Sequence, residues 1–329
     1  MRVFSGIKPT GDPTLGNYSG GFRQYAATQE LGEAFFCIVD LHAITVEYEP
    51  DDLHRRTLDL AAMLLATGID PERSTLFVQS HVTAHPQAAW LLSAVIGYGQ
   101  LGRMTQFKEK GEQQRFVSTA LFNYPVLMAG DILLYRSTHV PIGDDQRQHL
   151  ELARDIAERF NARFGETFVV PEPIYPEAGA RIMDLQDPTE KMGKTGSSDL
   201  GTVRMLDEPE AIRRKFRSAV TDSGREVVYD RAEKPGIANL LEILEVATGE
   251  PIPSIEERYR EKGYGDFKQD VAEAVVDLLS PIRMRYEALR TDEPALLQVL
   301  TRGADRAREA SAPVVEAMYE RMGFVLPST

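Results

Sequence analysis

Apolar runs and helical patterns alternate along the first third of the chain. Short apolar runs at residues 3–4, 35–39 and 75–78 predict buried strands. Residues 51–67 carry apolar side chains three or four positions apart, which predicts an amphipathic helix that ends at Gly68. This order predicts a parallel sheet covered by helices, in which ligands bind at the carboxyl ends of the strands.

The pattern becomes mostly helical after the third apolar run. Residues 84–163 are predicted to be largely helical, with the clearest helix at 146–163 and a short strand and turn at 138–143. A Gly/Ser/Asp-rich loop is predicted at 196–201. Further helices are predicted at residues 209–219, 237–248, 267–289 and 294–322, the last broken near Pro313. A helical domain is therefore expected to follow the α/β domain, with the boundary near residue 185.

The composition is that of a globular protein of about two domains, with 329 residues, 43% hydrophobic and 26% charged. The net charge of -13 argues against a generally basic nucleic-acid binder, so a polyanion would need a local basic patch. The candidate patch consists of Arg213, Arg214, Lys215 and Arg217.

The single cysteine, Cys37, excludes internal disulfides and cysteine-rich metal sites, and its apolar neighbours predict core packing. The start of the chain lacks the apolar segment of a signal peptide. No run approaches the roughly 18 apolar residues of a membrane span. These features predict a cytoplasmic protein that does not enter a membrane.

Residues 5–18 form a glycine-containing loop between the first apolar run and a potential helix at 18–30. Unpaired N–H groups at a helix start, together with glycines that let a ligand approach, make a place where a phosphate can bind. Neither GxxxxGK[ST] nor GxGxxG occurs here, so a plain strand–turn–helix remains the alternative.

Two lysines, Lys191 and Lys194, stand three residues apart before the Gly/Ser loop. Such a pair can place two ammonium groups on a bound polyphosphate whose leaving group gains charge. The alternative is a pair of solvated loop lysines.

A carboxylate, Asp131, lies inside the strongly apolar segment 124–135. Burying a carboxylate is costly unless it is paired. Asp131 is therefore a ligand acceptor in an apolar pocket, or else a helix-surface side chain or the partner of an arginine or backbone amide.

Gly143 and two acids, Asp144 and Asp145, precede the predicted helix at 146–163. One of the acids can cap that helix. With Gln146 they can also hold an amine or a ribose.

The histidines and the remaining sequence motifs give little support for a metal site or a hydrolase. His149 is expected to pack or to face solvent, because no second ligand stands at metal spacing. His42 follows a predicted strand, where a binding role is open. The chain has no Ser-His-Asp order, no HExxH and no EF-hand loop, so hydrolase and metalloenzyme functions lack a motif.

Together these motifs resemble the bacterial tryptophanyl-tRNA synthetases, a class I aminoacyl-tRNA synthetase family, over essentially the whole chain. Residues 14–17 look like the family's version of the HIGH signature, and residues 191–195 look like KMSKS. Lys8 stands where a glutamine is common, and Gly193 and Thr195 replace two serines. The resemblance also rests on residues 6–11, 103–110, 124–135, 143–149 and 179–183.

The resemblance implies a Rossmann-like α/β catalytic domain at residues 1–185, a parallel sheet with helices on both faces. An all-helical anticodon-binding domain would follow at residues 186–289. The C-terminal helix, residues 290–329, would pack back on the first domain. The family resemblance also implies a homodimer bridged by tRNA(Trp).

The implied reaction has two steps. ATP activates L-tryptophan to tryptophanyl-adenylate and pyrophosphate, and the tryptophanyl group then passes to the 3' end of tRNA(Trp). Mg2+ would arrive with ATP, and no protein metal site is expected. Catalysis in this family uses positioning and electrostatic stabilisation, without a protein nucleophile.

Site residues carry over from the family by position. The residues expected to bind ATP are Lys8, Pro9, Thr10, Gly16, Asn17, Gly143, Asp144, Asp145, Ile182, Lys191, Met192, Gly193, Lys194 and Thr195. The residues expected to bind tryptophan are Asp131 for the indole N–H, Tyr124 and Gln146 for the ammonium, and Phe4, Met128 and Ile142 for the ring. The residues expected to act in catalysis are Lys191, Lys194, Asn17 and Lys110.

The shielded carboxylate of Asp131 suggests how tryptophan is selected. The indole N–H is a donor with no acceptor capacity. We therefore expect Asp131 to find its hydrogen-bond partner only when tryptophan is bound, and tyrosine to leave the pocket underfilled.

Three alternatives remain open from the residues. They are a tyrosine-specific synthetase of the same fold, a small nucleotidyltransferase with a HIGH-type motif, and a catalytically silent paralogue that binds tRNA or a protein. The Asp131 segment favours tryptophan over tyrosine, and the helical part and second lysine motif exceed what a nucleotidyltransferase needs. Retention of both lysines argues against a silent paralogue.

Overall fold

The computed structural model of the chain describes residues 1–107, 116–143, 146–175, 181–193 and 198–326. Within them, five strands form a parallel sheet in the order β3-β2-β1-β4-β5. The strands are β1 (Arg2–Ile7), β2 (Glu33–Ile38), β3 (Thr75–Val78), β4 (His139–Pro141) and β5 (Glu172–Ile174). The predicted parallel sheet is confirmed. The strand order reverses direction between β1 and β4, which is where a sheet of this kind binds its ligand.

The edge strand β5 was not anticipated from the sequence, because prolines surround it. Pro173 lies inside the strand and Pro171 just before it. Proline cannot donate to a sheet ladder, so a proline-containing segment argues against a central strand. β5 pairs only with β4 among the described strands, and this edge position tolerates the missing N–H.

Two apolar cores cover the two faces of the sheet, and β2 contributes side chains to both. Phe35 and Cys37 point into the core formed with α5 (Ala84–Leu92), α8 (Thr119–Leu133) and α9 (Arg147–Phe164). Phe36 and Ile38 point into the core formed with α4 (Pro50–Ala66) and the later helices. This alternation is the period-two pattern of a strand buried on both sides. The expected core position of Cys37 is confirmed.

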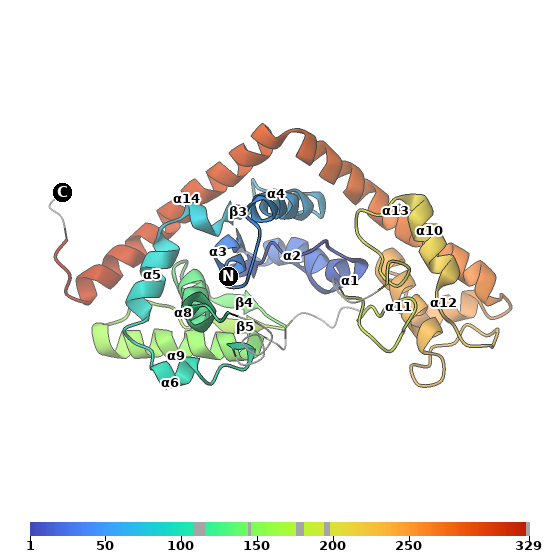
Figure 1. The fold of residues 1–329 in the computed structure, drawn as a ribbon, viewed down its shortest axis with the longest axis horizontal. Coiled ribbons are helices and arrows are strands. Elements are labelled where there is room, and N and C mark those ends of the chain that lie inside the picture. Colours follow the sequence, from blue (N-terminus) through green and yellow to red (C-terminus); the bar gives the residue numbers. More distant parts are fainter. Residues whose placement is uncertain (108–115, 144–145, 176–180, 194–197, 327–329) are drawn as a thin grey trace.

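The chain forms an arch in which two long helices meet at the top (Figure 1). The sheet and its helices lie at one end, and α10 to α12 lie at the other, against the first half of α13. The helices beyond the sheet are α10 (Pro209–Ser218), α11 (Pro235–Thr248), α12 (Ile252–Arg258), α13 (Tyr264–Thr291) and α14 (Glu293–Arg321). The shorter ones near the sheet are α1 (Leu15–Asn17), α2 (Arg23–Thr28), α3 (Asp40–Ala43) and α6 (Tyr98–Leu101).

The expected break of the last helix near Pro313 is wrong, because α14 runs unbroken from Glu293 to Arg321. An interior proline removes one backbone hydrogen bond and costs about 3 kcal/mol. Several apolar residues around it are buried in the core with α5 and α9, and their packing outweighs that cost. They are Ala304, Ala307, Val314, Val315 and Met318.

The backbone of α14 lies very close to β3. A Cβ atom added at Gly303 would stand 1.8 Å from the carbonyl oxygen of Leu76. Only glycine allows this approach. Among the described helices, none is long and apolar enough to cross a membrane.

Candidate active site

The loop after β1 is fixed by a reciprocal cap at the start of α1. The Thr14 backbone N–H donates to Asn17 Oδ1 at 2.9 Å, and the Asn17 N–H donates to Thr14 Oγ1 at 3.3 Å. Both polar residues of the HIGH-like segment therefore hold the turn together, as in a capping box. The chain continues through a short π-helix (Tyr18–Phe22) into α2, so the expected helical stretch after the loop is confirmed.

A long-range pairing, which no local pattern reveals, holds the same loop in place. The Leu15 N–H donates to the Val203 carbonyl at 2.9 Å, and the Met205 N–H donates to the Pro13 carbonyl at 2.9 Å. This pairing brings Arg204, which was not among the expected site residues, to the loop.

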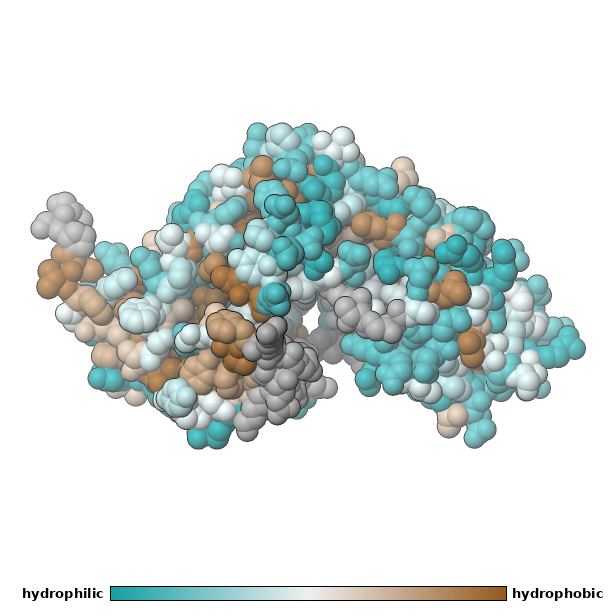
Figure 2. Space-filling model, in the orientation of Figure 1, coloured by the Kyte–Doolittle hydropathy of each residue, from teal (hydrophilic) through white to brown (hydrophobic). Residues whose placement is uncertain are grey.

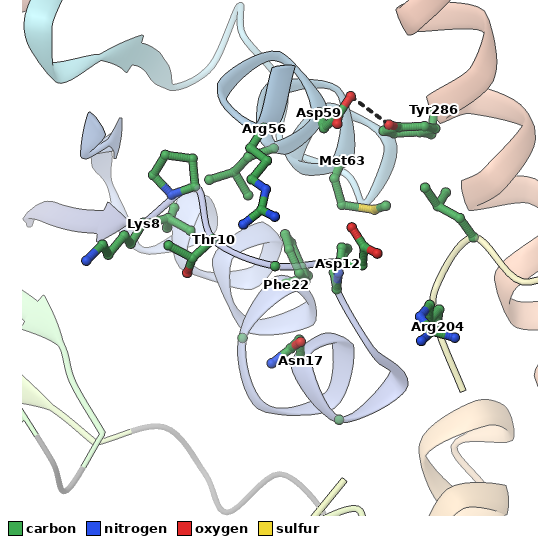
Figure 3. Close-up of a pocket in the computed structure, with 18 of the residues that line it drawn as sticks. Lys8, Thr10, Asp12, Asn17, Phe22, Arg56, Asp59, Met63, Arg204 and Tyr286 are labelled. Atoms are coloured by element: carbon green, nitrogen blue, oxygen red, sulfur yellow. Dashed lines mark hydrogen bonds between the residues drawn. The ribbon is translucent and has the colours of Figure 1, made fainter. Parts of the chain in front are cut away.

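A cavity of about 510 Å³ opens beside this loop (Figure 3). Arg56 reaches toward it from α4, and Arg204 lies across the cavity, beyond Asp12. Six expected ATP-binding residues line it: Lys8, Pro9, Thr10, Gly16, Asn17 and Lys191. With Arg55, the lining carries five cationic side chains against three carboxylates, Asp12, Asp59 and Asp207, an excess of positive charge that favours an anion.

The segment that begins the second lysine motif packs against the loop. The Met192 N–H donates to the Ile182 carbonyl at 3.1 Å, and both side chains are buried. A Cβ added at Gly16 would lie 3.5 Å from the Met192 carbonyl oxygen. The two signature segments therefore touch, although Ile182, Met192, Gly143 and Gly193 are not part of either cavity lining. Five expected residues, Lys110, Asp144, Asp145, Lys194 and Thr195, lie outside the described residues.

A second cavity of about 280 Å³ lies between the carboxyl ends of β1 and β4. All six residues expected to bind tryptophan line it: Phe4, Tyr124, Met128, Asp131, Ile142 and Gln146. Lys8 lines both cavities and so lies at their junction. A polar group bound in one cavity therefore comes close to an anion bound in the other.

The expectation that Asp131 finds its partner only with tryptophan bound is wrong. Its Oδ2 contacts His42 Nε2 at 2.7 Å, and its Oδ1 accepts from Gln79 Nε2 at 2.6 Å and contacts His85 Nδ1 at 2.6 Å. The sequence could not show this, because His42 follows β2 while Gln79 and His85 follow β3, all far from Asp131 along the chain. The carboxylate still borders the cavity, and a carboxylate accepts about four hydrogen bonds, so one acceptor direction remains for a ligand.

Charge in this cavity is set by burial and by the histidines. Burial opposes ionisation of Asp131, but His42 and His85 outweigh it and lower its pKa to about 2. Burial raises the pKa of Tyr124 to about 12, which keeps its hydroxyl protonated. That hydroxyl donates to Gln106 Oε1 at 3.2 Å and contacts His149 Nε2 at 2.8 Å. His149 is therefore packed inside, the first of its two expected places.

Two of the four side chains in the candidate basic patch on α10 form hydrogen bonds within the protein. Lys215 is 1% exposed and donates to the Thr202 carbonyl at 2.8 Å and to Asp207 at 2.7 Å. Arg213 forms two hydrogen bonds to Glu273, at 2.7 and 2.9 Å. The periodic basic residues of a surface helix do not reveal which of them face inward, so the patch as a set of four exposed cations is wrong.

The sequence matches known proteins over nearly its full length. Residues 1–280 match the family model of class I tRNA synthetases for tryptophan and tyrosine, and the chain belongs to that family. It is 49% identical over 325 residues to the tryptophan–tRNA ligase of Caldanaerobacter subterraneus subsp. tengcongensis, covering 99% of both chains. It is 52% identical over 330 residues to that of Leifsonia xyli subsp. xyli, covering 99% of this chain and 98% of the other.

A solved structure agrees with these relatives. The chain matches the tryptophanyl-tRNA synthetase of Campylobacter jejuni, complexed with ADP and tryptophan, with a TM-score of 0.87 and 33% identity. The match covers 98% of this chain and all 100% of the other. The resemblance to tryptophanyl-tRNA synthetases and the Rossmann-like fold with added helices are confirmed.

Proposed function

We propose that the chain is a tryptophan–tRNA ligase, which activates L-tryptophan with ATP and transfers it to the 3' end of tRNA(Trp). The observation that carries the proposal is the pair of cavities joined at Lys8, one apolar around an ionised Asp131 and one with an excess of cationic side chains. An amino acid in the first and a nucleotide in the second would meet where the carboxylate must attack the α-phosphate. The names of the relatives support the same reaction.

The smaller cavity would hold tryptophan. Phe4, Met128 and Ile142 supply apolar contact for the indole ring, and Asp131 Oδ2 would accept the indole N–H. Tyr124 and Gln146, which line the same cavity, would hold the ammonium. The ionised state of Asp131 makes its hydrogen bond to a neutral donor charge-assisted.

The larger cavity and its neighbouring segments would hold ATP. Lys8, Pro9, Thr10, Gly16, Asn17 and Lys191 line it, and Gly143, Ile182, Met192 and Gly193 would contribute mainly through their backbones. Asp144, Asp145, Lys194 and Thr195 complete the proposed set. Mg2+ would enter with ATP as part of the substrate.

Catalysis would rest on charge placed where the pyrophosphate forms. Lys191, Lys194 and Lys110 would stabilise negative charge as the bond to the α-phosphate breaks, and Asn17 would orient the nucleotide. Lysine suits this role, because its ammonium is a point charge on a flexible stem. The attacking group is the substrate carboxylate, so the protein needs no nucleophile.

The proposal also assigns a function to each domain of the chain. Residues 1–185 would form the catalytic unit and residues 186–289 the anticodon-binding unit. The last helix, within residues 290–329, would return to the catalytic unit. The contacts of α14 with α5 and β3 support this arrangement.

An apolar surface near the start of α8 supports a homodimer. Ser118 Oγ donates to the Thr45 carbonyl at 3.2 Å, and Tyr98 packs on Phe122 with ring centroids 5.0 Å apart, so these segments adjoin. Figure 2 shows apolar residues gathered over this part of the molecule. The exposed large apolar side chains there are Ile44, Tyr48, Trp90, Tyr98, Phe116 and Val117. Contiguous apolar patches of this kind mark protein interfaces. We place the dimer in the cytoplasm.

Light scattering tests the dimer. Trp90 is 79% exposed, so Trp90→Glu should shift the mass in solution from dimer to monomer. Met284, 65% exposed on α13, provides the control, because Met284→Glu should leave the dimer intact. A monomeric wild type, or a dimer in both variants, would reject this surface.

Pyrophosphate–ATP exchange tests the reaction itself. Exchange should depend on tryptophan, should not require tRNA and should be far weaker with tyrosine. Charging of tRNA(Trp) should follow. Exchange with tyrosine but not with tryptophan would overturn the assignment.

A further inference from the structure

A second layer of polar side chains lies behind Asp131, away from the tryptophan cavity. Gln79 follows β3, His85 lies in α5 and Tyr135 follows α8, and all three are fully buried. A buried polar group is costly unless its hydrogen bonds are satisfied. Three such groups in one place therefore need a structural or functional reason.

The contacts form one chain from Tyr135 to the cavity. The Tyr135 hydroxyl contacts His85 Nε2 at 2.8 Å, and His85 Nδ1 contacts Asp131 Oδ1 at 2.6 Å. An ionised carboxylate only accepts, so His85 Nδ1 must carry a proton. In a neutral ring Nε2 then accepts from the Tyr135 O–H. Tyr135 thus selects the His85 tautomer that donates to Asp131.

Tyr135 is itself held rigidly by aromatic neighbours. Its ring stacks on Phe35 and Phe4 with centroid distances of 4.6 and 5.6 Å. Phe4 also lines the tryptophan cavity. The hydroxyl that fixes the His85 tautomer therefore has little freedom to move.

The two carboxylate oxygens of Asp131 have different hydrogen-bond partners. Oδ1 is occupied by Gln79 and His85, both behind the cavity, whereas Oδ2 contacts His42, which lines it. Two donors on one oxygen oppose rotation of the carboxylate. Among the described contacts, the acceptor direction that remains belongs to Oδ2.

We propose that His85 is a positioning residue for amino-acid selection. Together with Tyr135 and Gln79 it fixes the Asp131 carboxylate so that Oδ2 presents its remaining acceptor direction to an indole N–H. His85 touches no substrate and acts only through Asp131. The inference rests on the proposed tryptophan–tRNA ligase function. It adds the buried residues that hold the Asp131 carboxylate in one orientation.

A pair of substitutions separates this role from simple packing. His85→Asn keeps a donor near the position of Nδ1 and loses the contact with Tyr135. His85→Gln places its amide near Nε2 and loses the donor to Asp131. Tyr135→Phe removes only one hydroxyl and serves as the mildest variant should either histidine variant fail to fold.

Steady-state activation of tryptophan and of benzothienyl-alanine, which lacks the N–H, provides the readout. His85→Gln should lower kcat/KM for tryptophan about tenfold, as expected for loss of one directional hydrogen bond, and for the analogue less than about threefold. His85→Asn should keep most of the wild-type preference. Tyr135→Phe should reduce the preference by about two- to fivefold.

Equal losses for both amino acids in His85→Gln and in Tyr135→Phe would overturn the positioning role, because a packing defect cannot sense the N–H. The wild-type protein in the same assay distinguishes a failure of the proposed function from a failure of this inference. If it fails to activate tryptophan, the proposed function falls and this inference falls with it. If it activates tryptophan and the variants lose both substrates equally, only this inference falls.

Discussion

The two cavities on either side of Lys8 are built in different ways. The smaller one is walled by β1, α8 and the end of β4, and its carboxylate is held by three buried side chains. The larger one is walled by the loop after β1, by α4 and by segments near residues 191 and 204, and its lining carries lysines and arginines beside three aspartates. Under the proposed function, selection of the amino acid would depend on the packed core, whereas the charge for activation would come from loop lysines and from the arginines of α4.

This difference has a measurable consequence. Changes in the larger cavity should alter rates with little effect on folding, because its charged groups are partly solvated. Changes in the smaller cavity should alter substrate choice and stability together, because its polar groups are buried in the core.

Removing a charge from the larger cavity should have the greatest effect. Lys191→Ala should slow adenylate formation about 10²–10³-fold, as expected for loss of one group that stabilises the developing charge. Its thermal midpoint should stay near that of the wild type, because Lys191 is exposed. Single-turnover kinetics measures the rate. Lys262→Ala, another exposed lysine, is the control. An unchanged rate for Lys191→Ala would remove it from the mechanism.

Removing the buried carboxylate should affect both substrate choice and stability. Asp131→Ala should cost about 1.5–3 kcal/mol toward tryptophan, or roughly 10–150-fold in kcat/KM, and much less toward benzothienyl-alanine. It should also lower the thermal midpoint, because His42, His85 and Gln79 would lose their shared partner. Equal loss for both amino acids would make Asp131 purely structural.

The cap in the HIGH-like segment should have a smaller effect. Thr14→Ala removes the hydroxyl that accepts from the Asn17 N–H, a loss of about 1 kcal/mol for a helix cap. The expected result is an increase of about fivefold in KM for ATP, measured by exchange. Thr14→Ser retains the hydroxyl and should behave like the wild type. If both variants match the wild type, the cap does not shape the nucleotide site.

The smallest expected effect is that of pH on selection. The pKa of Asp131 is about 2, so its carboxylate is ionised throughout pH 5–8 and the preference for tryptophan over benzothienyl-alanine should stay flat there. Because the folded-state pKa lies below the ordinary value of about 4, Asp131 stabilises the fold above pH 4, and this contribution is lost as pH falls toward 2. Acid unfolding of wild type and Asp131→Asn measures the difference. A preference that is already lost near pH 4, the ordinary pKa of an aspartic acid, would contradict the lowered pKa.

The sequence predicted the elements whose signals are local. The first three strands, α4, α9, α10, α11, α13 and α14 follow from apolar spacing and flanking glycine or proline, whereas the short α12 was not predicted. Asp131 also stood out, because a carboxylate inside an apolar helix is unusual.

Features created by long-range contact could not be predicted. Gln79 and His85 reach Asp131 from positions 52 and 46 residues away, and Arg204 reaches the loop after β1 through a pairing with Thr14. Lys215 belongs to the same class, since its burial depends on Asp207 and the Thr202 carbonyl. In each case the residue type is ordinary, and only the fold gives it a partner.

The close approach of Gly303 to Leu76 has a consequence for folding during synthesis. β3 is the edge strand opposite β5, and α14 packs against it. An open strand edge invites pairing with other chains. During synthesis β3 is completed more than 200 residues before α14 emerges from the ribosome. A nascent or prematurely terminated chain therefore carries an open edge until its last helix arrives, and bulk at position 303 would leave that edge open in the finished protein as well.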